Sequence, residues 1–83
     1  MDFFDKVKEK INGKFNPEDI ILIDNSSLHK KHKSFDPNKI HLKIILKSKK
    51  LKNMDKILAH KEIYSTLKDE MKDKIHALEI EIL

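Results

Sequence analysis

The strongest constraint on the fold is residues 56–83, where a helical pattern gives way to an alternating one. Apolar residues between Ile63 and Met71 fall on one side of a helical wheel, and charged residues face elsewhere. After Lys74, apolar residues instead recur at every second position. The pattern predicts a helix over residues 56–74 followed by a strand that closes the chain.

The residues before this stretch predict one more helix and two strands. Asp2 can cap a short amphipathic helix, for which Gly13 is the expected C-terminal stop. Residues 20–24 and 40–48 are expected to be strands, the second with one buried and one basic face. The lysine-rich residues 47–52 are expected to form a turn or a strand end.

The predicted order is therefore helix, strand, strand, helix, strand, with Asn53 or Asp55 as the cap of the second helix. The first two strands can pair antiparallel across their connection, whereas a strand–helix–strand crossover favours parallel pairing. Both helices must then cover the same face of a three-stranded mixed sheet. We expect a single α+β domain over residues 1–83.

Composition excludes several classes of protein. The 83 residues include no cysteine, so the chain has neither a disulfide framework nor thiolates for an autonomous metal site. The first ten residues lack the apolar core of a signal peptide, and no apolar run approaches the roughly 20 residues that cross a bilayer. A nucleophile elbow and a Gly-rich phosphate loop are also missing. We expect a cytoplasmic protein that is not an enzyme.

The charge of the chain suggests a nucleic-acid hypothesis. The formal net charge is +4, and all 18 basic residues are lysines, so the bidentate arginine contact to guanine is not available. Gly13 is the only glycine, which excludes the G-x-x-G loop of true KH domains. Any DNA binding should be weak and rest on phosphate contacts from Lys30, Lys31, Lys33, Lys47, Lys49, Lys50 and Lys52.

The five histidines are the residues with the clearest chemistry. His60 lies on the apolar side of the predicted helix, in its first turn, where a ring can pack inward and still show a nitrogen to solvent. His29 and His32 form an H-x-x-H pair in the loop between the first two strands, without the fixed geometry of a helical metal pair. His41 is expected on the polar face of its strand, and His76 beside a helix end.

Several short motifs occur in a fixed order. They are F-N-P at residues 15–17, D-N-S at 24–26 followed by His29, H-L-K-I at 41–44, H-K-E-I-Y-S-T-L at 60–67, and I-H-A-L at 75–78. Together with Ser48 and Glu70, these motifs resemble those of the BolA family over nearly the whole chain. The chain departs from the family pattern at Ala59, where an arginine is usual, and at Asn53, where a glycine is usual.

The resemblance implies an α+β fold of the class II KH-like type and a partnership with a monothiol glutaredoxin. In that family the two proteins can share a two-iron, two-sulfur cluster, for which the glutaredoxin cysteine and glutathione supply thiolates. The resemblance assigns the family's histidine ligand to His60 and the second ligand to His29, with His32 as the fallback. The alternative that it implies is a DNA-binding transcriptional regulator. The isolated chain would be a monomer or a weak homodimer without a cofactor.

Overall fold

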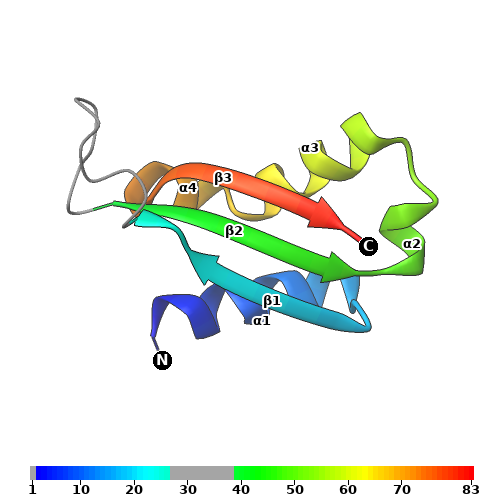
Figure 1. Cartoon of the computed structure of the whole chain (residues 1–83), viewed down its shortest axis with the longest axis horizontal. Coiled ribbons are helices and arrows are strands. Elements are labelled where there is room, and N and C mark those ends of the chain that lie inside the picture. The colour runs from blue at the N-terminus through cyan, green and yellow to red at the C-terminus, as the bar shows by residue number, and fades with distance from the viewer. Residues whose placement is uncertain (1, 27–38) are drawn as a thin grey trace.

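The computed structural model describes residues 2–26 and 39–83. Apart from the connection between the first two strands, most of which lies outside the described residues, successive helices and strands are joined by short connections (Figure 1). In chain order they are α1 (Phe3–Phe15), β1 (Asp19–Asp24), β2 (Ile40–Lys47), α2 (Lys49–Lys52), α3 (Lys56–Thr66), α4 (Lys68–Asp73) and β3 (Ile75–Ile82). Within these described parts, no helix is both long enough and apolar enough to cross a membrane.

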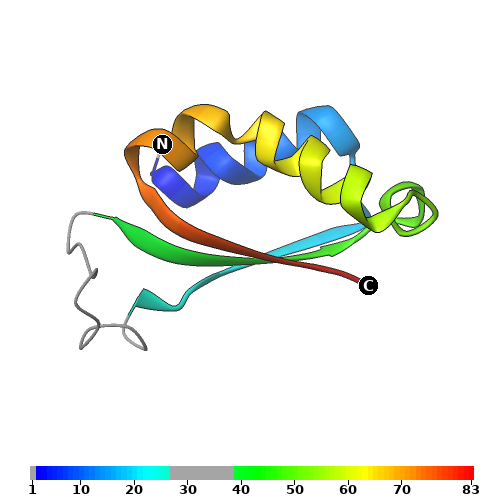
Figure 2. The ribbon, with the colours of Figure 1, turned by 90° about the horizontal axis from the view of Figure 1, so that it is seen from above.

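The three strands form one sheet in the order β1-β2-β3. β1 pairs antiparallel with β2, and β2 pairs parallel with β3. Figure 2 shows α1, α3 and α4 on one face of this sheet, while the other face is open. The predicted α+β class, the strand pairing and the placement of the helices on one face are confirmed.

The core lies between the helices and the central strand. Leu42, Ile44 and Leu46 of β2 are at most 1% exposed, and the residues between them face the open side, as the alternating pattern predicted. In β3, the inward positions continue this layer as partly buried residues. The fully buried cluster comprises Val7, Ile11, Phe15, Leu42, Ile44, Leu46, Leu51, Ala59, Ile63, Leu67 and Ile75.

The first helix begins as predicted but ends later. The Asp2 carboxylate accepts the Asp5 backbone N–H at 2.8 Å, which confirms the N-cap. The predicted stop at Gly13 is wrong, because the helix continues through Phe15, which is 8% exposed and packs into the core. Asn16 then adopts the left-handed conformation, with φ of 47°, which asparagine tolerates better than most residues.

Residues 47–52 also differ from the prediction of a turn or strand end. Lys49–Lys52 forms a short helix, α2, because the Ser48 hydroxyl accepts the Leu51 N–H at 3.2 Å and Leu51 is buried in the core. Of the two predicted caps for the next helix, Asp55 takes the position, and its carboxylate accepts the Leu58 N–H at 3.3 Å.

The predicted helix over residues 56–74 is interrupted. α3 ends at Thr66, and Leu67, with φ of −101° and ψ of 21°, separates it from α4. The Thr66 hydroxyl donates to the Glu62 carbonyl at 2.8 Å, a bond to the preceding turn that often bends helices. Leu67 is fully buried, so the bend keeps an apolar side chain in the core.

A buried carboxylate links α4 to α1. Glu70 is 2% exposed, and its Oε2 lies 2.8 Å from Lys10 Nζ and 3.7 Å from Lys6 Nζ. Burial raises the pKa of Glu70, but the Lys10 hydrogen bond and the charges of both lysines outweigh it, so the pKa lies below its usual value. The helical pattern alone did not indicate that this residue is buried.

Candidate functional site

The histidines of the described residues lie at two ends of the sheet. His41 and His76 lie where β2 and β3 begin, whereas His60 lies beside the end of β3. The remaining predicted site residues of the loop fall outside the described residues: His29, His32, Lys30, Lys31 and Lys33.

His76 occupies an irregular position in the sheet. The register between β2 and β3 pairs Ile40 with Ile75 but His41 with Ala77, so His76 is an extra residue on β3. A bulge of this kind redirects side chains, and bulges are over-represented next to active sites. The His76 side chain is exposed, and its ring centroid lies 5.0 Å from that of His41. The structure thus brings two imidazoles together.

The end of β1 and the two residues that follow it lie at the same end of the sheet as His41. The Asn25 N–H donates to the His41 carbonyl at 2.8 Å, and the Ser26 hydroxyl accepts the His41 N–H at 3.1 Å. Asp24 in turn accepts hydrogen bonds from the backbone N–H and the hydroxyl of Ser26. The chain segment that carries the other two predicted loop ligands is therefore attached to the fold beside His41 and His76.

These two imidazoles do not form a complete metal site alone. Across residues 2–26 and 39–83, no three histidine or carboxylate side chains gather closely enough to hold a metal ion. Imidazole nitrogen is nevertheless a good ligand for iron. A metal bound at this end would need further donors from the attached segment or from a partner protein.

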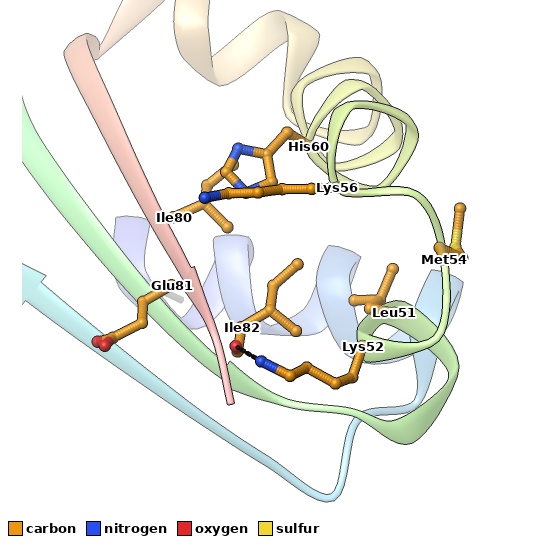
Figure 3. Close-up of a pocket in the computed structure, with 8 residues that line it drawn as sticks. All are labelled: Leu51, Lys52, Met54, Lys56, His60, Ile80, Glu81 and Ile82. Atoms are coloured by element: carbon orange, nitrogen blue, oxygen red, sulfur yellow. Dashed lines mark hydrogen bonds between the residues drawn. The ribbon is translucent and has the colours of Figure 1, made fainter.

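His60 belongs to a different site. It is half-buried in the first turns of α3 and lines a cavity of about 270 Å³ beside the end of β3 (Figure 3). Leu51, Ile80 and Ile82 give this cavity an apolar lining, and Lys56 lies alongside the histidine ring. The half-buried position agrees with the expectation that the ring packs inward and is still partly open to solvent.

The distance between the two ends limits which histidines can act together. Ile80, which lines the cavity with His60, follows His76 by four residues, or about 13 Å along a strand. Metal–nitrogen bonds are about 2 Å long, so two nitrogen ligands of one ion lie within about 4 Å of each other. This separation along β3 disfavours a single ion held by both His60 and His76. The assignment of His60 as ligand stays a prediction, for which His76 is now a rival.

The described lysines of the nucleic-acid hypothesis gather around α2. Lys47, Lys49, Lys50 and Lys52 are all exposed. The first, second and fourth line a shallow depression together with Glu18, and the ammonium of Lys52 donates to the Ile82 carbonyl at 3.3 Å. Together these four lysines form a basic surface, although the Lys52 ammonium is partly engaged by the Ile82 carbonyl.

Comparison with known proteins agrees with this fold. The family of BolA-like proteins matches residues 11–83. The chain belongs to the BolA family. Two relatives share the name "DNA-binding transcriptional regulator BolA", one from Haemophilus influenzae and one from Vibrio cholerae. They are 29% and 28% identical over 76 residues, which cover 92% of this chain and 71% and 69% of the relatives.

Solved BolA structures show the same architecture. The BolA domain of SufE1 from Arabidopsis thaliana is 27% identical, with a TM-score of 0.78 over 93% of this chain and 85% of that domain. BolA1 from the same plant is 22% identical, with a TM-score of 0.80 over 99% of this chain and 90% of that one. The second likeness supports the fold alone, and the family membership explains the order of motifs along the chain.

Proposed function

We propose that this BolA protein is a non-enzymatic partner of a monothiol glutaredoxin, with which it shares a two-iron, two-sulfur cluster in iron–sulfur assembly, trafficking or iron regulation. The observation that carries the proposal is the exposed His76 imidazole at the sheet bulge, with His41 beside it and Ser26 hydrogen-bonded to the His41 backbone. A chain without cysteine can contribute only nitrogen or oxygen donors, so the thiolates must come from glutaredoxin and glutathione.

Two histidines of this chain would meet the ligand requirement of one iron atom in the proposed complex. His76 would supply one imidazole, and His29, or His32 in its place, would supply the second from the attached segment. The His41 ring, packed against His76, restricts the orientations that the ligand ring can adopt. The cluster, when bound, supplies electron transfer or a unit for delivery to other proteins.

Anaerobic titration with a monothiol glutaredoxin tests this proposal. Glutaredoxin carrying a glutathione-ligated cluster is mixed with the BolA protein, and visible circular dichroism and size-exclusion chromatography follow the products. We expect a one-to-one complex that retains the cluster and has a changed visible spectrum, because imidazole replaces thiolate at one iron. An unchanged spectrum and separate elution of the two proteins would contradict the proposal.

DNA binding is a second candidate, supported by the exposed lysines around α2 and by the name that the two bacterial relatives share. Four phosphate contacts would give a slope of about −3.6 for the logarithm of affinity against that of salt concentration. Fluorescence anisotropy with duplex DNA over a range of salt concentrations measures this slope. Weak, salt-sensitive binding without sequence preference is expected, whereas salt-resistant, sequence-selective binding would favour the regulator function.

A further inference from the structure

The cavity that His60 lines beside the end of β3 forms a groove that plays no part in the proposed cluster site. Its floor is apolar, with Ile80 and Ile82 from β3 and Leu51 from α2. Lys56 and His60, one turn apart on α3, lean over Ile80 in Figure 3. A rim with the Lys56 ammonium and the His60 imidazole above an apolar floor suits a ligand that has both an apolar group and carboxylates.

The outer edge of β3 adds backbone hydrogen-bonding groups to this groove. The Leu83 N–H donates to the Leu46 carbonyl in β2. The backbone N–H and carbonyl groups of Leu83, and of every second residue before it, therefore point toward β2. The alternate positions, of which Ile80 is one, point their N–H and carbonyl groups to the outer edge. β3 is the last strand of the sheet, so no further strand of the described chain covers these groups.

Side chains already occupy the edge positions on either side of Ile80. The Tyr64 hydroxyl donates to the Leu78 carbonyl at 2.9 Å, and the Lys52 ammonium donates to the Ile82 carbonyl at 3.3 Å. The peptide groups of Ile80 lie between these two bonds, and no hydrogen bond to them from a described residue occurs on this edge. Both flanking bonds are exposed, so an incoming strand can replace them.

The surroundings favour a protein segment over nucleic acid. The residues that line the groove include no phenylalanine, tyrosine or tryptophan on which a base could stack. Next to Lys56, the side chains of Ile57 and Leu58 are 77% and 54% exposed. Neighbouring exposed apolar residues are typical of protein contact surfaces.

We propose that this groove binds an extended segment of a partner protein, which adds to the edge of β3 as a short fourth strand and carries acidic and apolar side chains on its helix-facing side. Lys56 and His60 would face those carboxylates, and Ile80 would pair with the segment's backbone. On the open side of the sheet, the segment would meet Glu79 and Glu81, so basic residues are favoured there. The alternation of charge along the segment is thus specified.

Two blocked peptides of identical composition test this proposal. Asp-Lys-Val-Lys-Asp places its carboxylates and valine on one side and its lysines on the other, whereas Lys-Asp-Val-Asp-Lys reverses the charges. Each is titrated into the full ¹⁵N-labelled chain and followed by amide NMR. We expect the first peptide to shift the Ile80, Lys56 and His60 signals and to bind about five-fold more tightly than the second, with slower hydrogen exchange at Ile80.

Two variants separate the groove from general charge attraction. Lys56→Gln should weaken the first peptide about three-fold, while Lys68→Gln, an exposed lysine on α4, should leave its affinity unchanged. Equal binding of both peptides, or shifts that omit Ile80, would overturn the proposal. It would also be overturned if single-stranded DNA bound the groove more tightly than the peptide, or if raising the protein concentration alone shifted the same signals through pairing of two copies.

Discussion

The two ends of the sheet use the same strand, β3, in different ways. At its start, the register with β2 shifts by one residue, and His76 and His41 come together at the surface. At its end, the register is regular, and Ile80 and Ile82 form the floor of the groove that Lys56 and His60 border. The comparison shows that regular alternation lines the groove with apolar residues, whereas the register shift accompanies an exposed histidine beside His41.

The largest loss of stability should come from a substitution in β2, the central strand, which runs between both ends of the sheet. Ile44 is fully buried on the central strand, so Ile44→Ala should lower the free energy of unfolding by about 2–5 kcal/mol. Chemical denaturation followed by circular dichroism measures this loss. Ile45→Ala is the matched control, because its side chain faces the open side and is only partly buried. Equal losses for the two variants would mean that the helix-covered face is not the core.

The next effect concerns the ion pair that holds α4, and hence the start of β3, against α1. Glu70→Gln should lower the free energy of unfolding at pH 7 by about 1–3 kcal/mol, since it removes the charged partner of Lys10. The exposed Glu79→Gln should change stability little. Chemical denaturation at pH 7 measures the free energy of unfolding of both variants. Similar losses of stability in the two would contradict the burial of Glu70.

The same pair should give the protein a distinct pH dependence. The folded pKa of Glu70 lies below its unfolded value of about 4.3, so its stabilising contribution is present above that value and is lost as pH falls through the folded pKa. The wild-type protein should therefore lose more stability than Glu70→Gln when the pH is lowered from 5 toward 2. Chemical denaturation of both proteins at a series of pH values measures this difference, and equal losses of stability in the two proteins would contradict it.

The smallest effects should distinguish the two ends. Asp55→Ala removes the cap of α3 and should cost about 1 kcal/mol, with NMR shifts confined to the groove around His60. Ser26→Ala removes the hydroxyl that accepts the His41 N–H and should shift the signals of His41 and His76 instead. If either variant shifted both sets of signals equally, the two ends would not be independent.

Periodicity in the sequence predicted most of the fold. The alternation of Leu42, Ile44 and Leu46 requires burial on one side of the strand, and only a layer of helices on that side satisfies it. The helix ends were harder, because tertiary packing decided them. Phe15 gains burial when α1 passes Gly13, and burial of Leu51 stabilises a helical turn among lysines.

The candidate site was harder to predict for a related reason. Alternation through Leu78, Ile80 and Ile82 would place His76 on the helix-covered face, and nothing in a single sequence marks the residue at which a register shifts. His60 was assigned as ligand from its resemblance to a family motif. Its separation from His41 and Ser26 depends on the parallel direction of β3, which becomes visible only when the strands are paired.

Pulsed electron paramagnetic resonance on the reduced cluster complex tests the central claim most directly. The BolA protein is labelled with ¹⁵N-histidine and bound to unlabelled glutaredoxin. The hyperfine couplings between the electron spin of the cluster and the histidine nitrogens are compared for the wild type, His76→Ala and His60→Ala. We predict that His76→Ala removes a strong nitrogen coupling, whereas His60→Ala leaves the spectrum unchanged. Loss of that coupling in His60→Ala but not in His76→Ala would contradict the account and support the His60 assignment.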